Sequence, residues 1–166
     1  MKHGKKYDIT PYGTESMHVL RAEKGFIIVG QDTDGSVTPK DINMDWIVSK
    51  KKEDFLGKRS FSRSDTRRTD RKQLVGLLVN DKKTVLPEGS YVVDEAKPRP
   101  PMEMIGHVSS SYYSPTCDHP IALALIKNGL NRMGDVVKIP LMNGKVIDAT
   151  ITDSIFYDKE GVRNNE

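Results

Sequence analysis

Cysteine, aromatic residues and long apolar runs are all scarce in this sequence. Its 166 residues include a single cysteine, Cys117, so the chain can form no internal disulfide and no site of four cysteines. The longest apolar runs, Phe26–Val29 and Ile121–Ile126, fall far short of the roughly 20 residues that cross a bilayer. No apolar run follows the basic start Met1–Lys6, so no secretory signal is predicted. These absences exclude a disulfide scaffold, a zinc ribbon and a membrane-spanning helix, and they make a reducing cytoplasm the expected location.

The composition suits one globular domain, or a small domain that carries a piece of another. The net charge is +3, but residues 50–72 hold ten Lys or Arg against four acidic residues, so the rest of the chain carries −3. Such clustering is typical of a nucleic-acid arm, yet only Phe55 and Phe61 supply aromatic rings there and no recognition motif accompanies them. We favour a solvated helix and linker, with no nucleic-acid partner. A surface for an acidic partner or for the polyanionic tail of a ligand is the intermediate interpretation.

The first 66 residues carry the signals of helices. Thr10-Pro11 resembles an N-cap followed by proline at the first helical position, and a helix is predicted over Thr14–Lys24. Gly25 should end it, because glycine adopts the left-handed conformation without a steric penalty. The continuous apolar run Phe26–Val29 predicts a short strand.

A turn and two further helical segments are predicted next. The residues Asp32–Ser36 are typical of a turn, and their spacing lacks the glycine and glutamate positions of a calcium loop. Thr38-Pro39, with Asp41 in the first turn, predicts a second helical segment that carries Trp46. A third is predicted over Gly57–Ser64.

Short apolar runs separated by turns fill the rest of the chain. We expect an inter-domain linker at Thr66–Arg71, a division into residues 1–66 and 67–166, and an exposed loop at Lys97–Pro101. Asn143-Gly144 predicts a hairpin with a two-residue turn of positive φ. Six short strands with tight turns predict a small antiparallel barrel or sandwich; they are expected near Gln73–Val79, Ser90–Val93, Met104–Ser110, Ile121–Lys127, Val136–Leu141 and Val146–Thr152.

Common catalytic and metal-binding motifs are missing. The four histidines are scattered, so no metal site is predicted. Cys117-Asp118-His119 is better explained as a loop between strands than as a thiol with its base, and Gly57–Ser60 lacks the upstream glycine of a phosphate loop. With no Gly-x-Ser-x-Gly motif and no paired carboxylates, no catalytic residue is predicted.

Two side chains are the candidate ligand contacts. Arg21 lies within an amphipathic helix that carries Met17 and Leu20, and its guanidinium suits a carboxylate or a planar ligand. Trp46 is the only tryptophan and offers a large flat face. From the residue types alone, structural roles are favoured for both.

The order of several short blocks resembles the glycine-cleavage T-protein (aminomethyltransferase) family over about Gly13 to Tyr157. The first block, Tyr12–Gly25, contains the family's Leu-Arg-x-Glu pattern at Leu20–Glu23. Further blocks follow in the family's order: Val29–Asp32, Thr38-Pro39, Asp45-Trp46, Lys52–Lys58, Leu74–Leu77, Ile105–Ser110, Ser114-Pro115, Ile121–Leu125 and Phe156-Tyr157. Within the family, the stretches Ile9–Gly35, Gly106–Tyr112 and Phe156–Asp158 are most similar to the C-terminal part of the alpha subunits of heterotetrameric sarcosine oxidases.

This resemblance implies a fold and a ligand. The fold is α+β, with the C-terminal portion of a folate-binding domain over 1–66 and a six-stranded, Greek-key-like antiparallel barrel over 67–166. The family binds tetrahydrofolate, and the matching positions make Arg21 a contact for the pterin and Trp46 a wall of the folate site. Glu23 also matches, and we expect it only to hold Arg21 in position.

The resemblance also implies a role within a larger oxidoreductase. Such complexes oxidise sarcosine at a flavin, and the alpha subunit's folate domain captures the carbon as 5,10-methylenetetrahydrofolate. The flavins and NAD would lie in other domains or subunits. The family's catalytic aspartate lies well before the Leu-Arg-x-Glu block, so we expect no turnover from this chain alone. Its partners would be other sarcosine oxidase subunits, the preceding part of the alpha subunit, or a second copy in a homodimer.

Two alternatives remain open. One is a split or stand-alone aminomethyltransferase, which takes an aminomethyl group from a lipoyl carrier. The other is a barrel that only docks a partner and has lost any ligand site. Neighbouring genes that encode flavin subunits, rather than lipoyl carriers, would favour the sarcosine oxidase role over the first alternative. A folate titration would distinguish a chain that binds folate from the second alternative.

Overall fold

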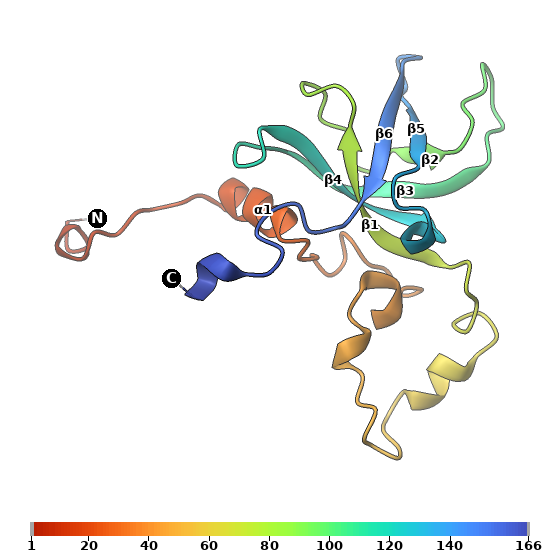
Figure 1. Cartoon of the computed structure of the whole chain (residues 1–166), viewed down its shortest axis with the longest axis horizontal. Coiled ribbons are helices and arrows are strands. Elements are labelled where there is room, and N and C mark those ends of the chain that lie inside the picture. Colours follow the sequence, from red (N-terminus) through yellow and green to blue (C-terminus); the bar gives the residue numbers. More distant parts are fainter. Residues whose placement is uncertain (1, 166) are drawn as a thin grey trace.

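A closed barrel of six antiparallel strands forms the centre of the computed structural model, which describes residues 2–165 (Figure 1). Around the barrel the strand order is β1-β4-β3-β2-β5-β6. The strands are β1 (Lys72–Val79), β2 (Tyr91–Val93), β3 (Met104–Ser114), β4 (His119–Lys127), β5 (Val136–Pro140) and β6 (Val146–Thr152). Each lies at or beside its predicted position. The predicted α+β class with a six-stranded antiparallel barrel is confirmed.

Strand β1 is buried on both faces. Val75, Leu77 and Val79 point into the barrel and are at most 1% exposed. Leu74, on the outer face, packs in a second cluster with Leu123, Leu125, Ile27, Val37, Ile42 and Phe156. Because segments from both ends of the chain cover this outer face, the strand is a continuous apolar run rather than an alternating one.

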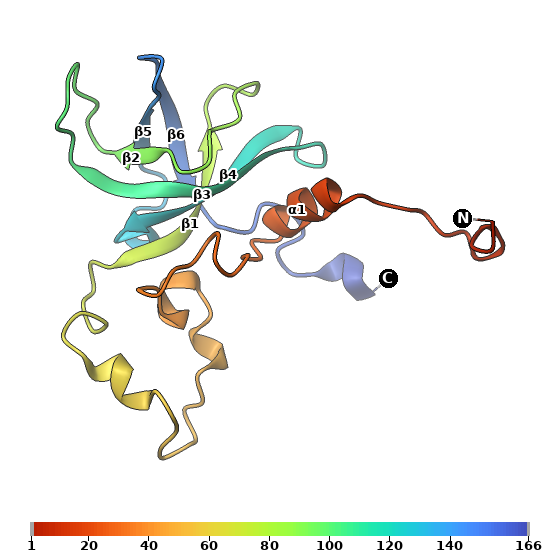
Figure 2. The same ribbon diagram turned by 180° about the vertical axis from the view of Figure 1, so that it is seen from behind.

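Helix α1 (Thr14–Glu23) contacts the outside of β3 and β4 (Figures 1 and 2). Its buried residues are Ala22 and Glu23. Met17 and Leu20 are about half exposed, so the apolar residues that suggested an amphipathic helix are not the ones that face the barrel.

The predicted range of α1, Thr14–Lys24, is confirmed to within one residue, but the predicted N-cap is wrong. The N-cap is Gly13, and Thr10-Pro11 lies in a non-helical, exposed stretch before it. A capping residue alone does not offset the cost of helix nucleation, and no side chain is buried there to help. At the other end, Gly25 has φ 68° and its N–H donates to the Ala22 carbonyl at 3.0 Å, as in a Schellman motif.

The predicted strand at Phe26–Val29 does not form. Phe26 and Val29 are 64% and 83% exposed, and a turn follows in which the Asp32 N–H donates to the Ile28 carbonyl. All six strands of the closed barrel already have two neighbours, so no sheet edge is left for this segment to pair with.

The remaining helical segments are short 3₁₀ turns. The second and third predicted helices are η2 (Pro39–Ile42) with η3 (Asp45–Ile47), and η4 (Lys58–Ser62). The others are η1 (Lys5–Tyr7), η5 (Gly129–Asn131) and η6 (Val162–Asn165). In Figures 1 and 2 the chain between η2 and β1 extends away from the barrel as a long excursion.

The β5–β6 hairpin is present, but its loop has three residues instead of the predicted two. Leu141 donates its N–H to the Lys145 carbonyl at 2.8 Å, and Gly144 donates to the Leu141 carbonyl at 3.0 Å. Gly144 has φ 81°, whereas Asn143 is not among the residues with positive φ. A turn closed by a left-handed glycine therefore replaces the tighter turn. Lys97–Pro101 forms an exposed loop, as predicted.

Candidate functional site

Arg21 lies at the centre of a polar cluster between α1 and β3. Its Nη1 donates to Asp32 Oδ2 at 2.7 Å and to the Phe26 carbonyl at 3.1 Å. Its Nη2 donates to Ser110 Oγ at 2.6 Å and to the Tyr112 hydroxyl at 3.2 Å. The guanidinium carbon lies 5.6 Å from the centre of the Tyr112 ring. The predicted pairing of Arg21 with a carboxylate is thus present.

Asp32 is the anchor of this cluster. Its side chain is fully buried, and it accepts hydrogen bonds from Arg21, from the Ile28 N–H at 2.8 Å and from the hydroxyls of Ser109 and Ser110. A buried carboxylate is tolerated only when its charge and its lone pairs are satisfied. Four donors, one of them cationic, meet that requirement.

A β-bulge in β3 brings the two serines to the same carboxylate. The pairing of β3 with β4 shifts register between Val108 and Ser110, which leaves Ser109 as an extra residue in the strand. In a regular strand, consecutive side chains point to opposite faces. Here both Ser109 and Ser110 donate to Asp32 Oδ1. The bulge therefore builds the polar floor beneath Arg21.

One donor of Arg21 has no partner. Nε is buried and has no hydrogen-bond partner. Among the described residues it is the only buried side-chain nitrogen or oxygen without one. The side chain as a whole is 10% exposed. A buried donor without a partner costs roughly 1–3 kcal/mol, and only a group that enters the interior of the cluster would offset this cost.

Glu23 has a positional role, but the predicted contact with Arg21 is wrong. Its Oε1 accepts from Ser114 Oγ at 2.6 Å, and its backbone carbonyl accepts from the N–H groups of Phe156 and Tyr157. The side chain is 2% exposed. Glu23 therefore fastens the end of α1 to β3 and to the C-terminal segment, while Asp32 takes the position beside Arg21.

Trp46, in η3, is 74% exposed. It lines a cavity of about 350 Å³ together with Phe26, Ile27, Ile42, Met44 and Ile155. Arg21 does not line this cavity, and no hydrogen bond joins the two within residues 2–165. Phe26 connects them, because its carbonyl accepts from Arg21 while the residue lines the Trp46 cavity.

A second buried ion pair ties the basic stretch to η2. Arg71 donates through Nε and Nη2 to Asp41, whose side chain is 5% exposed. Burial opposes ionisation of Asp41, but hydrogen bonds from Arg71 and Thr38 outweigh it and hold the pKa of Asp41 below its usual value. Arg71 is therefore an anchor at the end of the stretch Thr66–Arg71, whose role as an inter-domain linker remains a prediction.

Within residues 2–165, the other candidate catalytic and metal-binding residues are not brought together in a site. Among residues 2–165 no group of three or more His, Cys, Asp or Glu side chains is placed to hold a metal ion. Cys117 lies in the β3–β4 loop, where its Sγ is 3.9 Å from the Phe156 carbonyl, and Asp118 accepts from the Tyr113 hydroxyl at 2.6 Å. Within the same residues, no helix combines the length and apolar character that crossing a bilayer requires.

No sequence pattern predicted Asp32, Ser109 or Ser110 as a site residue. Asp32 looked like one acid of a turn, and the serines looked like ordinary strand residues. The available signal was that all three fall inside blocks of the resemblance, Val29–Asp32 and Ile105–Ser110. Burial of three polar side chains at one point could not be seen from spacing, because 77 residues separate Asp32 from Ser109.

The barrel, the helix laid across it and the Arg21 cluster define a class of protein. Residues 72–158 match the family model described as the glycine cleavage T-protein C-terminal barrel domain, and residues 1–52 match that of the GCVT N-terminal domain. The chain belongs to the glycine-cleavage T-protein family.

Its relatives include the alpha subunits of sarcosine oxidases. The chain is 54% and 52% identical to the sarcosine oxidase subunits alpha of Corynebacterium sp. strains P-1 and U-96, in each case over 98% of this chain and 17% of the relative. It is 30% identical to the aminomethyltransferase of Thermotoga petrophila, over 92% of this chain and 39% of that protein. The chain thus spans about a sixth of the length of the sarcosine oxidase subunits that it matches.

A solved structure has the same arrangement. Aminomethyltransferase T of the glycine cleavage system from Bartonella henselae matches with a TM-score of 0.73 and 26% identity, over 86% of this chain and 38% of that one. The resemblance stated from the sequence blocks is confirmed.

Proposed function

We propose that this chain contributes to tetrahydrofolate binding in a sarcosine oxidase alpha subunit, where the one-carbon unit from sarcosine is captured as 5,10-methylenetetrahydrofolate. The observation that carries the proposal is the Arg21 cluster, in which a buried carboxylate and a β-bulge hold a guanidinium with one unsatisfied donor. The identities favour this role over that of an aminomethyltransferase, at 54% against 30%.

The residues present suit a pterin. Both Nη groups of Arg21 are held by Asp32, Ser110, Tyr112 and Phe26, and Nε–H is the donor without a partner. Because Nε is buried, an acceptor atom of the pterin would reach it only if the cluster opened. Trp46 offers an exposed flat face beside an apolar cavity. Bound tetrahydrofolate would supply the two nitrogens that accept the carbon, and the residues of this chain would bind and orient it. We assign no catalytic residue to the described part of the chain.

Partner subunits would cover the exposed apolar side chains beside this site. Met17, Leu20, Phe26 and Val29 are 46–83% exposed and lie along α1 and the segment after it. Exposed apolar side chains this close in sequence are typical of interfaces. We propose that the remainder of an alpha subunit or another subunit of the complex binds here, with a homodimer as the alternative that a mass measurement would detect.

Calorimetry with the full chain tests the folate proposal. We expect 5-formyltetrahydrofolate, a reduced folate of good chemical stability, to bind with a dissociation constant of about 1 mM or lower. Arg21→Lys should weaken binding about tenfold, because lysine keeps the charge but lacks the Nε–H and the planar fork. Arg132→Lys is the matched control, since Arg132 pairs with Asp94 and Asp135 on the barrel. Equal affinities of folded wild type and Arg21→Lys, or no binding heat, would reject the proposal.

A further inference from the structure

The excursion between η2 and β1 contains an apolar groove of its own. A cavity of about 380 Å³ lies between η3 and η4, and its apolar lining consists of Pro39, Ile47, Val48, Phe55, Leu56 and Phe61. We call this surface the η3–η4 groove. Leu56 is fully exposed and Ile47 is 50% exposed. The groove is thus open, with aliphatic side chains at its mouth.

Uncompensated positive charge surrounds this groove. Residues 49–61 hold five Lys or Arg against Glu53 and Asp54. Lys52 itself lines the cavity. Lys50-Lys51 lie between the lining residues Ser49 and Lys52, and Lys58-Arg59 lie between Gly57 and Ser60. None of the five forms an ion pair within the described residues, whereas Arg68 and Arg71, further along, are both paired with aspartates. The rim therefore carries charge that the chain itself does not neutralise.

Segments η3 and η4 make few contacts with the strands of the barrel. The only helical elements of the excursion are 3₁₀ turns, and the chain around η4 lies away from the strands in both views (Figures 1 and 2). A long connection with an exposed apolar groove is more often functional than structural. Nucleic acid would use exposed aromatic faces for stacking, but Phe55 and Phe61 are partly buried, and the fully exposed apolar side chain of the groove is Leu56. The chemistry therefore favours a protein partner.

We propose that the η3–η4 groove docks an acidic segment of a partner protein, which inserts one apolar side chain into the cavity. The acidic residues of the segment would face Lys50–Lys52 and Lys58-Arg59, and the inserted side chain would cover Phe55, Leu56 and Phe61. This inference does not depend on folate binding, because neither Arg21 nor Trp46 lines the groove.

The test uses the full chain and two fluorescent peptides at an ionic strength of about 0.15 M. One peptide is Glu-Asp-Glu-Leu-Phe-Asp-Glu-Glu, and the second has Ala-Ala in place of Leu-Phe. Fluorescence anisotropy should show binding of the first peptide and at least about tenfold weaker binding of the second, because a buried apolar anchor carries much of an interface's energy. Leu56→Glu should weaken the first peptide about tenfold, whereas Met142→Glu, an equally exposed position on the β5–β6 loop, should not.

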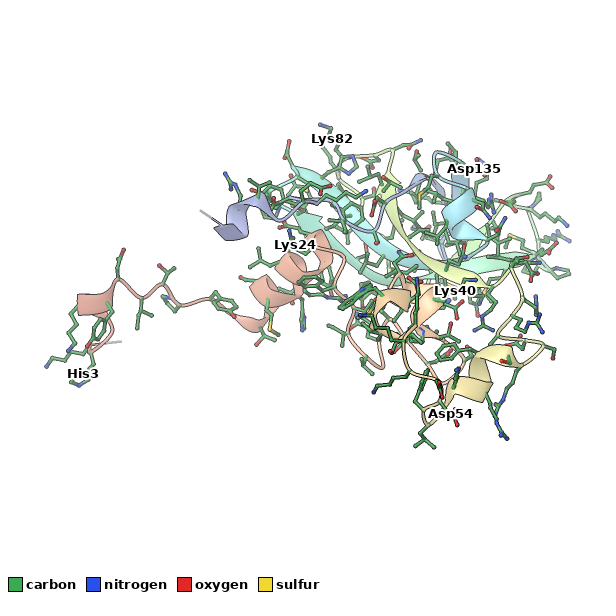
Figure 3. All side chains as sticks on the ribbon, turned by 60° about the horizontal axis from the view of Figure 1, so that its bottom comes forward. His3, Lys24, Lys40, Asp54, Lys82 and Asp135 are labelled. Atoms are coloured by element: carbon green, nitrogen blue, oxygen red, sulfur yellow. The ribbon has the colours of Figure 1, made fainter. Side chains whose placement is uncertain are left out.

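Charge reversal provides the second arm. Lys51→Glu combined with Lys52→Glu should abolish binding of the first peptide, and Lys82→Glu combined with Lys83→Glu should leave it unchanged. Both pairs change the charge equally, and Lys82 lies on the opposite side of the molecule from Asp54 of the excursion (Figure 3). Equal binding of the two peptides, preferential binding of a poly-dT oligonucleotide, or no binding of the first peptide at about 1 mM would each overturn the proposal.

Discussion

At the scale of single residues, Asp32 determines the geometry of the candidate site. It connects a loop, a helix residue and two strand hydroxyls through one carboxylate. We expect Asp32→Asn to lower the free energy of unfolding by roughly 3 kcal/mol, because removal of one partner leaves a buried guanidinium without its counter-charge. Urea denaturation would measure this.

The matched control for that change is Asp34→Asn. Asp34 is two residues away and exposed, and its side chain accepts hydrogen bonds from the N–H and the hydroxyl of Ser36. This variant should lose no more than about 1 kcal/mol. If Asp32→Asn proved as mild as Asp34→Asn, Asp32 would not be the anchor of the cluster.

The Asp41–Arg71 pair predicts a dependence of stability on pH. The folded-state pKa of Asp41 lies below the unfolded value of about 3.9. The ionised pair therefore stabilises the fold above that value, and this stabilisation is lost as the pH falls through the folded-state pKa. The difference in unfolding free energy between wild type and Asp41→Asn should be roughly 3 kcal/mol near pH 6 and should shrink below about pH 4. A difference that stays constant down to about pH 3 would contradict the assignment.

The identity of Arg21 could be predicted from the sequence, whereas its environment could not. The blocks that resemble the T-protein family include both Arg21, within Leu20–Glu23, and Trp46. The carboxylate that pairs with Arg21 could not be predicted from them. Glu23 is nearer in sequence but contacts Ser114, and Asp32 reaches Arg21 only because the chain turns after Ile28. Whether Arg21 and Trp46 contact folate remains a prediction.

At the scale of elements, Gly25 shows how the helix end is fixed by both conformation and space. A Cβ there would lie 2.6 Å from the Ser154 carbonyl oxygen, in addition to the strain of φ 68°. Gly30 has φ 93°, but a Cβ added there would meet no atom within 4 Å. We expect Gly30→Ala to cost about 1 kcal/mol and Gly25→Ala about 2 kcal/mol or more.

Thermal or urea unfolding of the two glycine variants separates the two effects. The excess cost of Gly25→Ala over Gly30→Ala measures the close approach of α1 to the C-terminal segment. Equal losses of unfolding free energy would mean that backbone conformation alone matters and that Ser154 moves to accommodate the added Cβ.

The strands could be predicted because their signals are local. Apolar runs bounded by Gly, Pro and Asn turns place all six within a few residues, and Val146–Thr152 agrees at both ends. The predictions that failed concern features that depend on tertiary context. Phe26–Val29 has the composition of a strand, but the closed barrel offers it no edge, and β3 continues to Ser114 because β4 pairs with it along its length.

At the scale of the whole molecule, buried apolar residues are distributed unequally along the chain. Apart from Ala22, the buried apolar residues lie within residues 74–151, while α1, the segment after it and the η3–η4 groove leave large apolar side chains exposed. Exposed apolar side chains of this kind support the proposal that partner subunits cover these surfaces.

Nitrogen–proton NMR of the full chain would show whether Arg21 and Trp46 share one folate surface, as we propose. Trp46 is the sole tryptophan and gives one indole N–H signal, and the unpartnered Nε–H of Arg21 can be assigned through its loss in Arg21→Lys. Addition of 5-formyltetrahydrofolate should shift both signals along the same saturation curve. If either signal stays unchanged at saturating folate in the folded protein, the two residues do not form one site.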